Sequence, residues 1–260
     1  MIDPLMFIAL LPAVVLVVYI CRKDRTDKEP PALIAKLLGY GVLSCLPAIV
    51  VELILSAIIE RLNVRNVYLG YFLEAFVVAG LTEETCKFLF LRTTWRNPAF
   101  DYQFDAIVYA VMVALGFAAF ENVKYVYSYG FATGIVRAVT AVPGHAIFGV
   151  FMGYFYGYAK LSDYWGRDDD RKAYLALSVV VPVLMHGCYD FLAFTQESDS
   201  RFTLLFYAYL VALYVFGIRR VNRSSRDDRR VTRETVFDYF RRMQYPMPPQ
   251  YHDRNDDFWR

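Results

Sequence analysis

The chain has few of the residues that build disulfide frameworks and the common metal sites. Among 260 residues there are 3 histidines and 4 cysteines. The cysteines lie in or beside apolar runs without any C-x-x-C spacing, which predicts free thiols and argues against a cysteine-type zinc site. The sequence also has no H-E-x-x-H motif, the helical signature of many zinc proteases. Charged residues are nearly missing from several long stretches of the chain, which argues against an ordinary water-soluble protein.

Those stretches are apolar and long enough to cross a membrane. Hydrophobic residues make up 57% of the chain, and the mean hydropathy is +0.30. About 20 apolar residues span a bilayer as a helix. We therefore predict an all-α, polytopic membrane bundle of about seven transmembrane helices, with 1–219 as the transmembrane domain. The predicted spans are 4–21, 33–59, 68–91, 105–127, 134–160, 173–194 and 202–219.

Lysine and arginine alternate between rich and poor loops, which predicts the orientation. The loops after the first, third and fifth spans and the start of the tail are rich in both residues. We expect a multi-pass protein of the cell membrane with its N-terminus outside and its C-terminus cytoplasmic. The first run lacks a basic segment before it and a cleavage site after it, so it is interpreted as a retained span.

The charged tail, 220–260, differs from the rest of the chain. It is rich in arginine and aspartate, and we expect it to be cytoplasmic and partly disordered. One short segment, 232–243, places apolar residues near one helical face and has the pattern of an amphipathic helix. Nothing in the chain points to a nucleic-acid partner; the lipid bilayer is the expected surrounding.

Two adjacent carboxylates, Glu83 and Glu84, lie inside the third apolar run. A charged side chain at the bilayer centre costs roughly 2.5–3.5 kcal/mol on insertion scales, so intramembrane ionisable residues are functional candidates by default. On a helix, Lys87 shares a face with Glu83, and Glu84 points about 100° away. One carboxylate is therefore expected to face the bundle centre while the other pairs with a donor.

The next three spans each carry a polar group as well. Glu121 and Asn122 lie on the fourth, His145 on the fifth, and His186 with Asp190 on the sixth. Polar groups on four consecutive spans predict one shared, buried polar chamber. A glutamate in such a site is suited to act as a general base, and a histidine to share the water or protonate the leaving amine. The residues thus favour hydrolysis.

Two other interpretations use the same residues. Buried carboxylates and histidines also form the proton relays of transporters and channels, which predict an inverted repeat and broken helices in matched positions. A non-catalytic scaffold would use the polar groups only to hold its helices together. The sequence shows no clear repeat.

Four motifs give the chain a resemblance to a known family, with a matching core at about 68–195. They are EETCK at 83–87, FAAFEN at 117–122, PGHAIFG at 143–149 and HGCYDF at 186–191. Their order and their placement on separate spans resemble the PrsW family of intramembrane proteases, which is grouped with the CAAX-processing and bacteriocin-processing (ABI) peptidases. This resemblance implies a helical bundle whose catalytic chamber opens within the bilayer.

The resemblance implies an intramembrane endopeptidase that cleaves a single-span membrane protein, such as an anti-sigma factor at its first site. The catalytic candidates are Glu83, Glu84, Glu121, His145 and His186, and the supporting candidates are Lys87, Asn122 and Asp190. The family has been classed both as glutamic-type and as metalloprotease. We favour a metal-free glutamate and histidine mechanism; if zinc is used, the candidate ligands are Glu121, His145 and His186.

Two expectations concern geometry. The second and fifth runs are longer than a bilayer requires and are expected to tilt or break, with Pro47, Pro143-Gly144 and Pro182 as the expected kink points. Counting along the spans places Glu83 nearer the cytoplasmic side than Glu121 and His186, by about 10 Å at ~1.5 Å per residue. A single site therefore requires strongly tilted helices or a later start of the third span.

Overall fold

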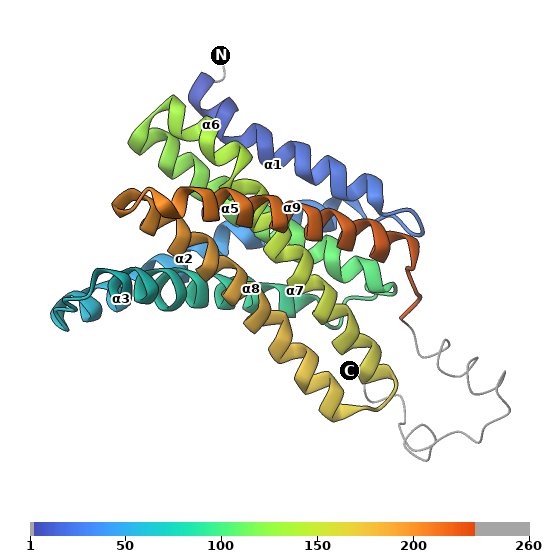
Figure 1. Cartoon of the computed structure of the whole chain (residues 1–260). Helices are drawn as coiled ribbons and strands as arrows, with labels where there is room; N and C mark the ends of the chain where they lie inside the picture. The colour runs from blue at the N-terminus through green and yellow to red at the C-terminus, as the bar shows by residue number, and fades with distance from the viewer. Residues whose placement is uncertain (1–2, 232–260) are drawn as a thin grey trace, which may run out of the picture.

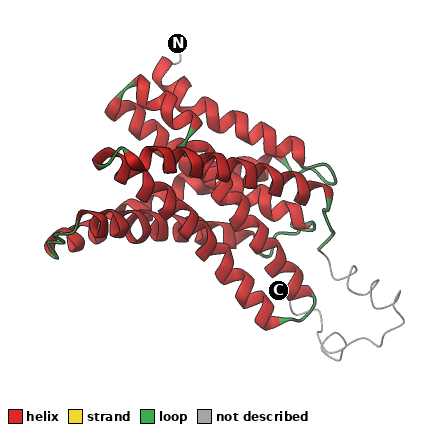
Figure 2. Ribbon diagram, in the orientation of Figure 1, coloured by secondary structure: helices red, strands yellow, loops and turns green. Residues whose placement is uncertain are grey.

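The computed structural model describes residues 3–231, and their helices confirm the predicted all-α bundle (Figure 2). The predicted amphipathic segment at 232–243 lies outside the described residues. The helices, in chain order, are α1 (Pro4–Lys23), α2 (Pro31–Arg61), α3 (Val67–Phe72), the π-helix η1 (Leu73–Leu81), α4 (Thr82–Leu91), the 3₁₀ turn η2 (Arg92–Thr94), α5 (Gln103–Tyr129), α6 (Phe131–Val139), α7 (Ala141–Tyr164), α8 (Asp168–Ser198) and α9 (Arg201–Arg226).

Six helical runs within the described part are long and apolar enough to cross a membrane, with α6 and α7 counted as one. The predicted third span is also helical throughout, but it is divided into α3, η1 and α4. Its middle nine residues form a π-helix, in which each hydrogen bond reaches one residue further than in an α-helix. Such segments are rare and frequent at functional sites, and this one ends two residues before Glu83.

The fifth predicted run breaks earlier than expected. Thr140, with φ −122° and ψ −70°, separates α6 from α7. Pro143 lies in the first turn of α7, where its missing N–H leaves no helical hydrogen bond unmade. The break therefore comes three residues before the proline, and α6 is a separate short helix.

Helix α5 forms the centre of the bundle, and α7, α2 and α1 pack around it (Figure 1). The contacts are close enough to require glycine. A Cβ on Gly41 of α2 would lie 2.1 Å from the carbonyl oxygen of Val113, and one on Gly153 of α7 would lie 2.4 Å from that of Ala106. Small residues at helix interfaces are the usual means of close packing in membranes.

Two of the helices are much longer than a bilayer is thick. Helices α2 and α8 each have 31 residues, or roughly 46 Å at ~1.5 Å per residue, against a hydrocarbon core of about 30 Å. Long helices of this kind accommodate by tilting. Figure 1 shows α8 running obliquely to α9, and α8 also packs against α4 and α7.

Candidate active site

The carboxylate pair lies in the first turn of α4, directly after the π-helix. Glu84 is fully buried, and Glu83 and Lys87 are 6% and 1% exposed. The ammonium of Lys87 lies 3.2 Å from Oε2 of Glu83 and 2.8 Å from Oε1 of Glu84, so it pairs with both carboxylates rather than with one. Removing charges from water is expensive, and this pairing offsets part of that cost. One Glu84 oxygen, Oε2, is buried without a hydrogen-bond partner.

The two histidines approach this pair from α7 and α8. Nδ1 of His186 lies 2.9 Å from Oε1 of Glu84, and Nδ1 of His145 lies 3.0 Å from Nζ of Lys87. The two rings meet edge to face with their centroids 5.1 Å apart. Residues that the sequence places on three different spans therefore meet at one point. The expected offset of about 10 Å between Glu83 and His186 is absent, since the atoms involved lie 3.9 Å apart.

Each histidine is held from behind by a carboxylate. Nε2 of His145 lies 2.9 Å from Oε2 of Glu121, and Nε2 of His186 lies 3.2 Å from Oδ2 of Asp190. An ammonium has only donors to offer, so Nδ1 of His145 accepts from Lys87 and its ring proton is on Nε2, facing Glu121. A carboxylate on the far nitrogen fixes both the tautomer and the ring orientation.

Arg137, which is not among the residues predicted for the site, completes the support of His145. Its Nη2 donates to Oε2 of Glu121 at 2.8 Å and its Nε to Oδ1 of Asn122 at 3.1 Å. Asn122 in turn donates to the carbonyl of Ala9, so it braces Arg137 and α1. Arg137 falls within the predicted span 134–160. The rule that selected the glutamates, an ionisable residue inside an apolar run, would have selected it too.

A cavity of about 610 Å³ opens onto this cluster. Its wall includes Glu83, Glu121, His145, His186 and Asp190, and also Ser56, Glu74 and Gln196. Glu84, Lys87 and Asn122 do not line it. Ligand cavities usually measure about 300–1,000 Å³. The chamber is therefore large enough for several residues of a peptide, and its wall brings them both imidazoles together with several carboxylates.

A family model for the PrsW family of intramembrane metalloproteases matches residues 29–218. The chain belongs to the PrsW family. It is 34% identical to protease PrsW of Bacillus subtilis (strain 168) over 214 residues, 82% of this chain and 92% of the relative. It is also 35% identical to protease PrsW of Oceanobacillus iheyensis over 215 residues, 82% of this chain and 93% of that protein.

More distant PrsW relatives match as well, and protease PrsW of Clostridioides difficile (strain 630) is 28% identical over 232 residues, 87% of this chain and 94% of the relative. No solved structure matches the chain. The family match begins at residue 29 and so includes α2, which the predicted core at 68–195 left out. The chain is thus a multi-pass intramembrane protease of the PrsW family, rather than a transporter or a scaffold.

The family description names a metalloprotease, and the PrsW site has donors that fit a divalent metal ion. Glu83, Glu84, His145 and His186 each offer one ligand atom, and these atoms all lie within 4.8 Å of one another. Two imidazoles with carboxylates are a donor set of catalytic zinc, and the unpartnered Oε2 of Glu84 is a spare ligand atom. Glu121, a zinc candidate from the sequence, is not in this group; it bonds the outer nitrogen of His145.

Proposed function

We propose that this protein is an endopeptidase that hydrolyses a peptide bond of a membrane-anchored protein inside the chamber. The observation that carries the proposal is the convergence of Glu83, Glu84, His145 and His186, of which all but Glu84 line a cavity large enough for a peptide. Hydrolysis needs a base for the water, a donor for the leaving amine and a stabiliser for the oxyanion.

The two glutamates take different roles in this mechanism. Glu83 lines the chamber and accepts the proton of the attacking water. Glu84 faces away from the chamber, and its contacts with Lys87 and His186 keep both of those side chains in place. This division agrees with the helical geometry expected for two adjacent residues.

The histidines handle the developing charge and the leaving group. His186 lies between Glu84 and Asp190. A proton on its Nδ1 can be donated to Glu84, and a proton on its Nε2 can be donated to Asp190. It is placed to protonate the leaving amine, while His145, fixed by Glu121, faces the same region of the chamber. A donor such as His186, positioned in advance in a water-poor site, stabilises an oxyanion far more than it would in water.

A divalent metal, held by donors from Glu84, His145 and His186, would polarise the scissile carbonyl and the attacking water. The metal-free alternative is favoured by Lys87, whose ammonium lies within 3.2 Å of three of the four donor residues and supplies a positive charge at the same place. Metal analysis of the purified protein distinguishes the two. Stoichiometric zinc that is lost in His145→Ala and His186→Ala supports the metal form. Well under one zinc per chain, with activity that resists chelators, supports the metal-free form.

The test of the proteolytic function is co-expression with single-span membrane proteins, including anti-sigma factors, followed by measurement of product size. Glu83→Gln is expected to abolish the cleavage product. Glu74→Gln is the matched control, because Glu74 lines the same chamber, hydrogen-bonded to Ser56 and away from the cluster. Equal cleavage by wild type and Glu83→Gln would overturn the proposal.

The proposed orientation places the end of α9 in the cytoplasm and the N-terminus of α1 outside. Lysines and arginines gather at the end of α1, between α7 and α8, and after α9, which all belong to one side of the bundle under this orientation. Fusion of a reporter to either terminus tests it, since a cytoplasm-dependent reporter is expected to work only at the C-terminus.

A further inference from the structure

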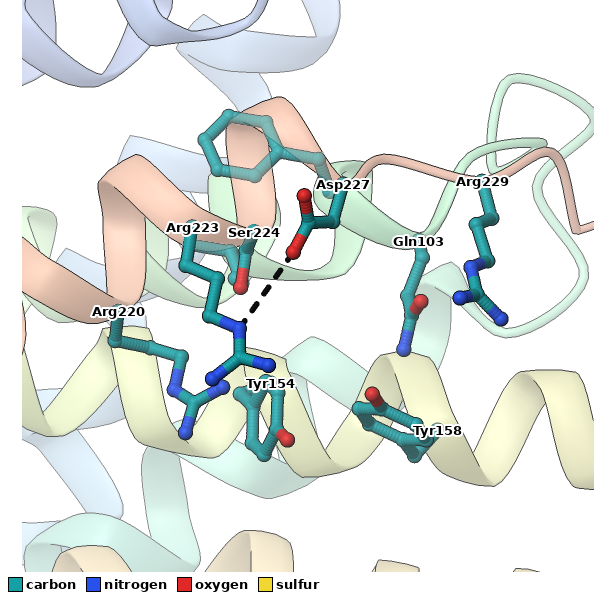
Figure 3. A pocket seen from close by; sticks show the side chains of 10 residues that line it. Gln103, Tyr154, Tyr158, Arg220, Arg223, Ser224, Asp227 and Arg229 are labelled. Atoms are coloured by element: carbon teal, nitrogen blue, oxygen red, sulfur yellow. Dashed lines mark ion pairs between the residues drawn. The ribbon is translucent and has the colours of Figure 1, made fainter.

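A second cavity lies where α9 ends, between α9, the first turns of α5 and the middle of α7 (Figure 3). Its volume is about 210 Å³, and it shares no wall residue with the chamber. Its wall contains three arginines, Arg220, Arg223 and Arg229, and one acidic residue, Asp227. The remaining polar groups include the hydroxyls of Tyr154 and Tyr158. The wall is therefore rich in hydrogen-bond donors and carries a net positive charge.

The three arginines are only partly satisfied by the protein. Arg220 lies over the ring of Tyr154, with its Cζ 3.9 Å from the ring centroid, and it has no ion pair with the rest of residues 3–231. Arg223 is 3.5 Å from Asp227, and both side chains are more than half exposed, so this pair is weak. The side chain of Arg229 has no hydrogen bond or ion pair with the rest of residues 3–231. Figure 3 shows Arg220 and Arg223 reaching toward Tyr154, with Arg229 on the opposite side.

The third arginine is placed by the fold rather than by a free loop. The backbone N–H of Gln103 donates to the carbonyl of Arg229 at 2.8 Å, and that of Phe104 donates to Asp228 at 2.9 Å. Val231, just beyond, is fully buried. The segment after α9 is therefore fastened to the start of α5. Arg229 lies across the cavity from Arg220 and Arg223 (Figure 3).

A phosphate group fits this chemistry. Guanidinium groups bind phosphate oxygens through paired N–H donors, and basic pockets between transmembrane helices on the cytoplasmic side bind phospholipid headgroups. The volume lies below the range of about 300–1,000 Å³ for drug-sized ligands, so a headgroup fits and a nucleotide does not. One turn before Arg220, Phe216 is 60% exposed, which provides apolar surface for an acyl chain.

We propose that this cavity binds the phosphate group of an anionic phospholipid. The bound phosphate joins α9 to α5 and α7, the helices that carry Glu121 and His145. A ligand that binds only the folded protein stabilises it by mass action. The lipid is therefore expected to raise the thermal stability of the whole bundle.

The experiment uses the full chain, purified in a zwitterionic detergent and titrated with phosphatidylglycerol, with phosphatidylcholine, or with inorganic phosphate. Thermal unfolding reports stabilisation, and native mass spectrometry reports retained lipid. Arg220→Gln combined with Arg223→Gln is expected to weaken the effect of phosphatidylglycerol by at least about tenfold, the loss that one charge-assisted hydrogen bond gives. The control, Arg219→Gln with Arg226→Gln, removes the same charge from exposed arginines of α9 that do not line the cavity.

Stabilisation by phosphatidylglycerol that the control keeps and the cavity variant loses would support the proposal. Three results would overturn it: equal losses in both variants, equal effects of the two lipids, or an effect of inorganic phosphate that matches the effect of phosphatidylglycerol at the same phosphate concentration. Arg229→Gln alone gives a second test that leaves α9 intact, and a wild-type response in that variant would remove the third arginine from the site.

Discussion

Helices α2 and α5 are both long and apolar, yet they lie in opposite environments. The most apolar stretch of α2 has a mean hydropathy of 2.5, and 17% of it is buried inside the bundle. The corresponding stretch of α5 has a mean hydropathy of 1.8, and 78% of it is buried. In water the more apolar helix would be the core. In a bilayer lipid is as apolar as leucine, so burial follows close packing and polar contacts instead. The less apolar helix is central because it carries glycine contacts and the groups that support the site.

The same contrast separates the polar cluster from the lipid-facing surface. Side chains such as Leu53 and Leu204 are 67% and 77% exposed in the bundle and suit the hydrocarbon. Glu84, Lys87 and His186 are buried almost completely and satisfy one another. A charged group in the bilayer is tolerated where protein surrounds it and partners are fixed. Four changes test how far this contrast holds, from the largest expected effect to the smallest.

Lys87→Met is expected to have the largest effect, because it leaves two buried carboxylates without their counter-charge. Breaking a buried pair by removing one partner costs about 3–5 kcal/mol. We expect a lower thermal unfolding temperature and loss of cleavage. Lys124→Met is the control, since Lys124 lines the same chamber but is exposed. Equal unfolding temperatures and equal cleavage in the two variants would show that the ammonium of Lys87 does not stabilise the buried carboxylates.

Gly41→Ala tests the close packing of α2 on α5. The added methyl would meet the backbone of Val113 and Phe117, and overpacking of this kind costs about 1–3 kcal/mol. Gly39, on the same helix, has no atom within 4 Å of an added Cβ. Gly39→Ala is therefore expected to be neutral or stabilising by up to about 1 kcal/mol. Thermal unfolding of both variants in detergent measures the difference.

Arg137→Gln tests the support of Glu121 and His145. Loss of a charged hydrogen bond is worth about 1.5–3 kcal/mol, and we expect kcat to fall by about tenfold with little change in KM, because Arg137 acts through Glu121. Arg137→Lys keeps the charge and should recover part of the rate. If Arg137→Lys and Arg137→Gln are equally impaired in kcat, or if only KM changes, the positioning role is wrong.

The smallest effect is expected in the loop between α1 and α2, where two carboxyl groups make the stability of the folded protein depend on pH. Burial raises the pKa of Asp24 to about 6 and that of Glu29 to about 7, and neighbouring carboxylates add to both shifts. The folded protein holds these protons more tightly than the unfolded chain. This stability is therefore present below pH 4 and is lost as the pH rises to about 7.

We expect the unfolding temperature to fall by roughly 2–4 °C between pH 5 and pH 8, because solvent screening at this partly exposed loop reduces the effect of the two pKa shifts to about 1 kcal/mol. The variant Asp24→Asn with Glu29→Gln should flatten the profile. Asp27→Asn, in the same loop but exposed, removes only a neighbouring charge that adds to both pKa shifts, so it should flatten the profile less than the double variant. A profile as steep in the double variant as in the wild type would assign the effect to other groups.

Much of the fold could be predicted because apolar length alone selects membrane spans. Every predicted span is helical, although the fifth is divided into α6 and α7, and the predicted end of the last span at 219 lies seven residues before the end of α9 at Arg226. The break before α7 was predicted at Pro143 but occurs at Thr140, since a proline in a first turn needs no partner. The glycines at 149, 153 and 157 of α7 follow the small-residue spacing of close helix pairs, so the sequence already carries the signal for the close contact of α7 with α5.

The sequence by itself determined the class of protein and the polar residues of its interior, because an ionisable side chain in an apolar run is costly wherever it lies. Only the tertiary structure decided which of their atoms meet. The π-helix before Glu83 and the oblique path of α8 bring side chains from three spans within 4.8 Å, although residue counting places them at different depths. The tertiary structure also pairs Arg137 with Glu121, and it directs the Nδ1 atoms of both histidines toward Lys87 and Glu84. Depth and ring orientation depend on tilt and helix contacts, which no single span encodes.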